Sequence, residues 1–174
     1  MTVPRHNPVS KRQLEGPIYI LEVYLYSGPV WKNFTRKNKA VSRTIQILSG
    51  QTLEDLHGAI FDAFDRFDEH MYEFQFGGKG PRDPRARRYV LSGGGDEMDD
   101  IFSDRKPAGT VEKTAIGALG LKVGDAFGYW FDFGDDWWHQ VNVAAIEEGT
   151  PTGTYPRVTQ RVGDSPPQYP DEEA

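Results

Sequence analysis

The chain has 174 residues and a formal net charge of −6, and this length suffices for one domain with a substantial core. The absence of cysteine excludes a disulfide framework, a thiolate metal site and a cysteine nucleophile. No stretch approaches the roughly 18 apolar residues of a membrane-spanning helix. We therefore expect a cytoplasmic protein without a membrane partner.

The first expected elements are strands. Residues 1–16 are polar and aperiodic, which predicts a disordered lead-in. Residues 18–26 are β-branched and aromatic throughout, which is typical of a central strand. We expect a second strand over residues 30–34, a basic loop over 36–43 and a third strand over 44–48.

The clearest helix begins after Thr52. Thr52 and Asp55 approximate a capping box, in which each side chain accepts from a backbone N–H of the other residue. Apolar residues then recur at three- and four-residue spacing, which predicts one apolar face on a helix over about 53–67. Arg66 falls on the polar face of this helix. Residues 71–76 alternate and predict the next strand.

The remainder combines a long interruption with a hairpin. Residues 77–113 predict a long loop or insertion, with room for a short strand near 88–91. The segments that follow are a helical turn over 114–121, hairpin strands over 126–133 and 137–146, and an extended C-terminal tail over 149–174. Together the elements predict a single α+β domain over 17–148, with a mostly antiparallel sheet packed against one main helix and smaller helical pieces.

The register of the hairpin decides where its polar residues point. Matching the apolar faces of both strands favours a three-residue loop at 134–136, with Phe133 opposite Trp137 and Phe131 opposite His139. His139 then faces the core. Asp132 lies on the opposite face, and Asp135 lies in the turn, where aspartate commonly caps the backbone.

Three histidines and two aspartates are candidate metal ligands. His57 shares the apolar face of the helix, and His70 begins the next strand. If these histidines converge with His139 and with Asp132 or Asp135, the imidazole and carboxylate groups would suit a divalent metal. The alternative is a set of hydrogen-bonded core histidines and a turn-capping aspartate, which simple hairpin geometry favours.

Basic residues gather in two segments and suggest a second kind of site. A continuous basic patch would attract phosphate. Trp31, Trp130 and Trp138 could stack on bases of a single strand, although tryptophan in a strand is more often simply packed. The alternative is two solvated loops of opposite charge, since an acidic stretch over 96–104 follows the second segment. The candidate nucleic-acid-binding residues are Arg36, Lys37, Lys39, Arg43, Arg85, Arg87 and Arg88.

The motifs also point to a family. The chain carries a Thr-Leu-x-x-Leu-His motif ending at His57, a His-x-Tyr-Glu-Phe motif beginning at His70, and Phe-Asp-Phe-Gly-Asp-x-Trp-x-His ending at His139. In these motifs it resembles the plasmid pRiA4b open-reading-frame-three-like family, whose members are also labelled TnpR-like passenger proteins of insertion elements. It departs from the family at Tyr72, where a histidine is usual, and in lacking the cysteines of the terminal segment.

The resemblance implies an α+β domain and a link to plasmids or mobile elements, but no reaction. We expect a non-enzymatic binding or accessory protein connected with nucleic-acid biology. The alternative is a metal-dependent hydrolase or nuclease, in which a divalent metal would polarise phosphate and activate water. A continuous basic surface favours binding, whereas histidines that converge in a cleft favour catalysis.

Overall fold

The computed structural model describes residues 16–93 and 106–170. Of the expected segments, the lead-in over 1–16 lies outside these residues except for its last position, and the acidic stretch over 96–104 lies wholly outside them. In chain order, the elements are β1 (Ile18–Ser27), α1 (Lys32–Lys37), β2 (Ser42–Leu48), α2 (Leu53–Ala63), β3 (Tyr72–Phe76), β4 (Arg87–Val90), β5 (Gly109–Thr110), the 3-10 turn η2 (Ile116–Leu119), β6 (Ala126–Phe131), β7 (Trp137–Glu147) and β8 (Arg157–Val162).

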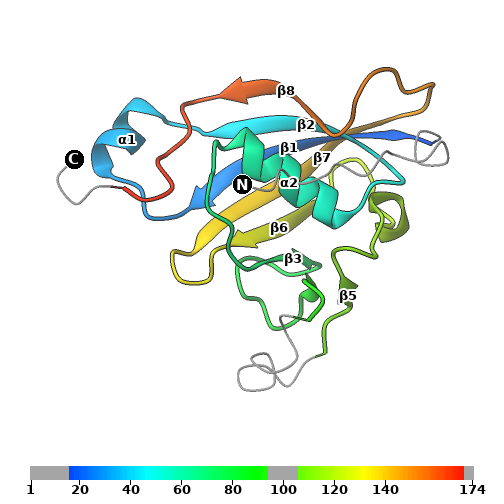
Figure 1. Cartoon of the computed structure of the whole chain (residues 1–174), viewed down its shortest axis with the longest axis horizontal. Helices are drawn as coiled ribbons and strands as arrows, with labels where there is room; N and C mark the ends of the chain where they lie inside the picture. The colour runs from blue at the N-terminus through cyan, green and yellow to red at the C-terminus, as the bar shows by residue number, and fades with distance from the viewer. Residues whose placement is uncertain (1–15, 94–105, 171–174) are drawn as a thin grey trace, which may run out of the picture.

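The strands form one sheet, and α2 lies across one of its faces (Figure 1). The strand order is β5-β4-β3-β6-β7-β1-β2-β8, and every neighbouring pair is antiparallel except β4 and β5. The core lies between α2 and the sheet, where Leu53, Leu56 and Ile60 are fully buried. The predicted α+β class and mostly antiparallel sheet are confirmed. Among the described residues the α-helices are α1 and α2 alone. The expectation of one main helix with several smaller helical pieces is therefore wrong in the number of helices.

The main helix begins where its capping box predicts and ends earlier than expected. The Thr52 hydroxyl accepts from the Asp55 N–H at 3.2 Å, and the Asp55 carboxylate accepts from the Thr52 N–H at 2.8 Å. The helix ends at Ala63, because Asp65 adopts a left-handed backbone with φ of 54°. The expected end near residue 67 is therefore wrong, and Phe67 is 73% exposed.

The segment after β1 is helical and not the expected second strand. Lys32–Lys37 forms α1, and the Phe34 side chain packs against the core while its neighbours stay exposed. Short apolar runs do not distinguish a strand from a single helical turn, and the four-residue spacing of Val30 and Phe34 suits the helix. The expected basic loop over 36–43 is divided between α1 and β2, with Arg43 inside β2.

The β6–β7 hairpin pairs odd-numbered residues with odd-numbered residues, as predicted, but in a different register. Phe131 pairs with Trp137 and Tyr129 pairs with His139, so the loop spans 132–136 and not 134–136. The longer loop arises because Asp132 and Asp136 adopt left-handed φ values of 59° and 56°. The Asp132 carboxylate also accepts from the backbone N–H groups of Gly134 and Asp135, each at 3.1 Å.

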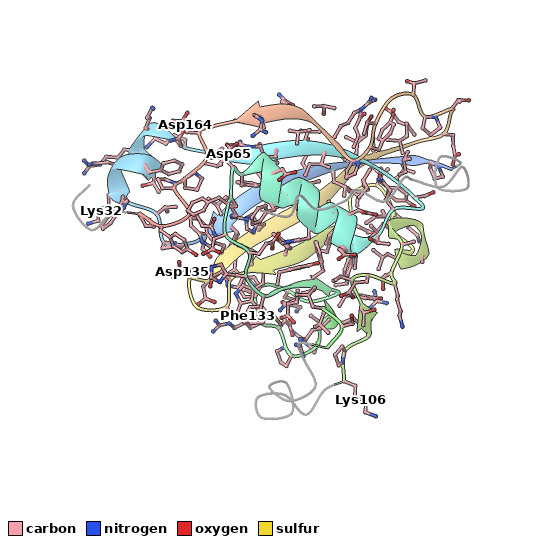
Figure 2. The ribbon with its side chains drawn as sticks, viewed as in Figure 1. Lys32, Asp65, Lys106, Phe133, Asp135 and Asp164 are labelled. Carbon is pink, nitrogen blue, oxygen red and sulfur yellow. The ribbon has the colours of Figure 1, made fainter. Side chains whose placement is uncertain are left out.

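The end of the chain returns to the sheet. β8 pairs with β2 and forms one edge, and Asp164 then lies beside α1, where it contacts Lys37 at 2.9 Å (Figure 2). The segment continues to Gln168, which is buried against the loop that follows α2. Within the described residues, we find no helix with the length and apolar character that crossing a membrane requires.

Candidate functional site

His57 lies on α2 and is buried in the core. In the neutral ring, Nε2–H donates to the Glu69 carboxylate at 3.0 Å, and Nδ1 accepts from the Tyr129 hydroxyl at 2.6 Å. The ring also stacks on Tyr72 at 3.6 Å with an interplanar angle of 2°. Burial raises the pKa of the Tyr129 hydroxyl, so this group stays protonated and remains a donor. Both ring nitrogens of His57 therefore have protein partners.

His139 lies on β7 and faces the same layer. Arg66 Nη2 lies 2.7 Å from His139 Nε2, and a guanidinium can only donate, so Nε2 is the acceptor. The proton of the neutral ring is consequently on Nδ1, which donates to the Tyr129 carbonyl oxygen at 3.2 Å. Burial, together with the positive charge of Arg66, lowers the pKa of His139 well below its ordinary value.

His70 lies nearer the surface than the other two histidines. Its Nε2 is 2.5 Å from the Tyr169 hydroxyl and about equally distant from two carboxylates, at 3.6 Å from Asp68 and 3.5 Å from Asp132. Tyr169 also donates to Asp68 at 2.7 Å, and this bond raises the pKa of Tyr169 to about 12. These contacts tie the C-terminal segment to the loop that precedes β3.

The three histidines do not converge on one point. His57 and His70 lie 6.1 and 5.9 Å from the centre of Phe131, whereas His139 is bonded to Arg66 and Tyr129. A cation at His139 Nε2 would have to displace a guanidinium that already occupies the position. Across residues 16–93 and 106–170, no group of three or more His, Cys, Asp or Glu side chains is placed to hold a metal ion.

Sequence reasoning missed Arg66, which is a central member of this cluster. The helical pattern predicts an exposed position, yet Arg66 is 7% exposed because α2 ends at Ala63 and the chain turns inward. The signal for this was weak, since only the left-handed backbone at Asp65 reverses the direction of the next side chain. Glu69, whose carboxylate bonds to His57, was missed as well, because it lies in the loop after the predicted helix, where no periodicity shows what a side chain contacts.

The two basic segments lie on separated strands. Arg43 on β2 and Arg88 on β4 have β1, β7, β6 and β3 between their strands, which corresponds to roughly 24 Å at the usual strand spacing. Arg43 is also buried and donates to backbone oxygens of Ala63, Val162 and Gly163. The expected continuous basic surface does not form through these strands. Arg36, Lys37 and Lys39 lie on or just after α1, Arg85 pairs with Asp83, and Arg87 and Arg88 lie on β4.

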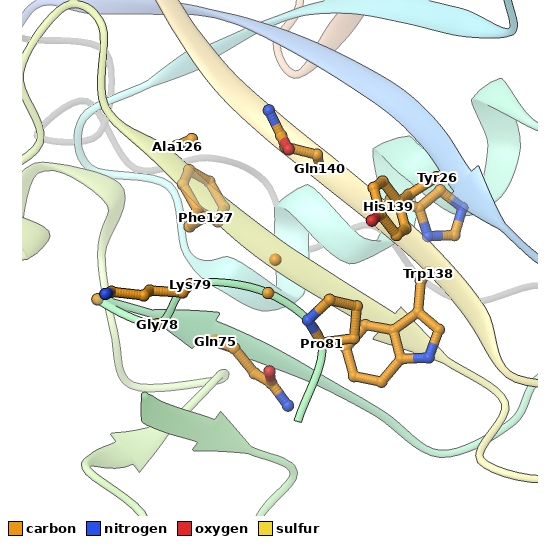
Figure 3. A pocket seen from close by; sticks show the side chains of 13 residues that line it. Tyr26, Gln75, Gly78, Lys79, Pro81, Ala126, Phe127, Trp138, His139 and Gln140 are labelled. Carbon is orange, nitrogen blue, oxygen red and sulfur yellow. The ribbon is translucent and has the colours of Figure 1, made fainter. Parts of the chain in front are cut away.

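A pocket of about 300 Å³ lies on the face of the sheet turned away from α2. Alternation along β6 and β7 sends Tyr129 and His139 toward α2, and Gly128, Trp138 and Gln140 toward this open face. The β3–β4 loop curls over the pocket and brings Lys79 and Pro81 to its rim (Figure 3). The pocket is lined by Tyr26, Gln75, Gly77, Gly78, Lys79, Gly80, Pro81, Ala126, Phe127, Gly128, Trp138, His139 and Gln140.

Hydrogen bonds hold the β3–β4 loop in place over this pocket. The Asp83 carboxylate accepts from the Lys79 N–H at 2.9 Å and from the Arg85 side chain at 3.1 Å, and the Arg85 bond holds the pKa of Asp83 well below its ordinary range. Gln75 accepts from the Arg82 N–H at 3.2 Å. The pocket is therefore built by a fixed loop on a fixed sheet.

A row of aromatic rings forms one wall. Trp138 stacks on Trp130 at 4.7 Å and 9°, and Arg82 lies over the far side of Trp130 at 4.8 Å while pairing with Asp136. Tyr26, on the neighbouring strand β1, is 66% exposed. Of these rings, Tyr26 is available to stack on a flat ligand, whereas Trp138 is 6% exposed and packs on Trp130.

The fold is that of an α+β protein whose single sheet is covered by a helix on one face and carries the pocket on the other. The chain belongs to the plasmid pRiA4b ORF-3-like protein family, whose model matches residues 33–169, and this confirms the resemblance seen in the sequence motifs. It is also similar in fold to the crystal structure of a protein of unknown function, MM3350 from Methanosarcina mazei Go1. The TM-score is 0.63 with 21% sequence identity, over 86% of this chain and 71% of that chain. The comparison with curated proteins gives no match.

Proposed function

We propose that this protein is a non-enzymatic binding protein that holds single-stranded nucleic acid on the open face of its sheet, as an accessory of plasmid or mobile-element biology. The observation that carries the proposal is the pocket of about 300 Å³ between the β3–β4 loop and the strands β6, β7 and β1. This volume is at the lower end of the range for small-molecule sites, which fits one nucleotide unit and not a duplex.

The lining supplies the groups that such a unit needs. Tyr26, which is 66% exposed, offers aromatic surface to a base, and stacking contributes about 1–3 kcal/mol per base. Trp138 lines the same pocket but is only 6% exposed, so it supplies an edge and not an open ring face. Gln140 offers an amide to a base edge, and Lys79 offers a positive charge to a phosphate. Gly128 and Ala126 leave room at the floor because they carry little or no side chain.

The same lining argues for binding without catalysis. Among the described pocket side chains, the ionisable groups that reach the open face are Lys79 and Tyr26, since His139 contributes its backbone side and points toward α2. The expected alternative, a metal-dependent hydrolase using His57, His70, His139, Asp132 and Asp135, depends on a ligand group that the described residues do not assemble. It stays the alternative, without a structural observation in its favour.

The test is a fluorescence titration with short single-stranded DNA and RNA, against a duplex of the same sequence, at low and high salt. We expect binding to single strands that weakens as salt rises. Lys79→Ala should weaken binding about equally for all sequences and reduce the salt slope by about 1. The matched control is Lys113→Ala, because Lys113 is exposed beside the beginning of α2, on the other layer.

A second variant tests the pocket without changing charge. A Cβ built on Gly128 meets nothing closer than 3.7 Å, so Gly128→Val is compatible with the backbone and fills the floor. We expect a folded protein that no longer binds single strands. Unchanged binding in this variant, or loss of binding in Lys39→Ala alone, would place the nucleic acid elsewhere and overturn the pocket assignment.

A further inference from the structure

Arg66 carries a positive charge in the interior, and no carboxylate of the described residues forms an ion pair with it. Its side chain is 7% exposed, and its guanidinium carbon lies 5.2, 4.8 and 5.2 Å from the ring centres of Phe64, Phe131 and Trp137. Among residues 16–93 and 106–170, its side-chain hydrogen-bond partner is His139, a neutral acceptor. Arg66 Nη1 is buried and has no hydrogen-bond acceptor within the described part of the chain.

The charge persists despite this environment. Burial lowers the pKa of Arg66 to about 10, so the guanidinium is still protonated at neutral pH. Asp132 acts on Arg66 in the opposite direction, but its Oδ1 accepts from the turn and its Oδ2 lies 3.5 Å from His70. The three ring faces offset part of the cost of the buried charge by cation–π attraction. The unpaired Nη1–H donor still costs stability.

The same cluster holds a second unpaired donor. Trp137 Nε1 is also buried without an acceptor among the described residues, and the Trp137 ring is one of the three that enclose Arg66. An indole N–H can only donate, as can a guanidinium. The cluster therefore presents two unused donors and one positive charge, and an anion is the kind of ligand that would satisfy all three.

We propose that Arg66 and Trp137 bind one small monovalent anion of the chloride type beneath the β6–β7 turn. A single positive charge balances a single negative charge, so a divalent anion such as sulfate would leave excess charge in the interior. Apolar walls favour a weakly hydrated ion over fluoride, whose dehydration is costlier. This site is separate from the pocket on the open face, because Trp137 and Trp138 point to opposite faces of β7.

The test is thermal unfolding in sodium chloride, fluoride and gluconate at equal ionic strength. An ion that binds only the folded state raises the melting temperature, by about 3–6 °C for each tenfold increase above its dissociation constant. We expect this rise in chloride and not in the bulky gluconate or in fluoride. Trp137→Phe keeps the ring and removes the N–H, and should abolish the chloride-specific rise, as should Arg66→Met.

The matched control is Trp31→Phe, which removes a buried indole N–H whose ring makes no contact with Arg66 among the described residues. It should keep the chloride response. Equal melting temperatures in all three salts would mean that water satisfies these donors, and the anion site would be wrong. A full chloride response in Trp137→Phe would overturn it as well, even if Arg66→Met fails to fold.

Discussion

Two buried histidines define the polar interior at the scale of single residues. His57 and His139 both bond to Tyr129, the first through its hydroxyl and the second through its carbonyl oxygen. The partners fix the proton of neutral His57 on Nε2 and that of His139 on Nδ1. Buried polar groups are tolerated when every member has a partner, and these rings satisfy that condition. They therefore act as structural links between α2, β6 and β7.

The stability of the protein should fall in mild acid because of His139. Its pKa is lowered in the folded state, whereas in the unfolded chain it titrates near the ordinary value of about 6.5. Below that pH the unfolded state binds more protons, so the free energy of unfolding decreases by up to about 1.4 kcal/mol per pH unit. Urea unfolding between neutral pH and mild acid measures this slope.

The variant that isolates this effect is His139→Gln, which is neutral at every pH and can still accept from Arg66. We expect it to be less stable than wild type at neutral pH but to lose less stability on acidification. Parallel pH profiles for the two proteins would show that another group causes the acid sensitivity.

At the scale of elements, the features that the sequence predicts correctly are those set by residues close together in the chain. The capping box at Thr52 and Asp55 is local, and so is the turn at η2, and both form where expected. The end of α2 and the hairpin register were predicted wrongly because both depend on left-handed backbones at Asp65, Asp132 and Asp136. Such conformations are uncommon for residues other than glycine, and tertiary contacts hold them.

The capping box gives a prediction for α2. Thr52→Ala removes the acceptor of the Asp55 N–H and should lower the free energy of unfolding by roughly 1 kcal/mol. The control is Thr35→Ala on α1, where the exposed hydroxyl donates to Lys32 and caps nothing. That change should stay within about 0.5 kcal/mol of wild type. Equal effects in urea unfolding would mean that the Thr52 cap contributes no special stability.

At the scale of the whole molecule, the strand order separates what the sequence places close together. Lys79 and Arg88 are nine positions apart, yet one serves the pocket rim and the other pairs with Glu73. Tyr26 and Lys79 are far apart in sequence and line the same pocket. No local pattern shows that β3 lies next to β6 or β1 next to β7, so the pocket was not predictable, whereas the aromatic strands that form it were.

The last prediction concerns the C-terminal segment, which packs against the loop that follows α2. Gln168 is 4% exposed. Its side-chain oxygen Oε1 accepts from the backbone N–H groups of Phe67 and Asp68 at 2.9 and 3.1 Å. Its side-chain Nε2 donates to the backbone oxygen of Asp68 at 2.7 Å. Gln168→Ala leaves these backbone groups without partners, which costs about 1–3 kcal/mol. Urea unfolding and faster hydrogen exchange at Phe67 and Asp68 measure the loss. Gln160→Ala is the control, because Gln160 is exposed on β8. If both variants match wild type, the bonds of Gln168 do not hold the segment, and the packing around it must do so.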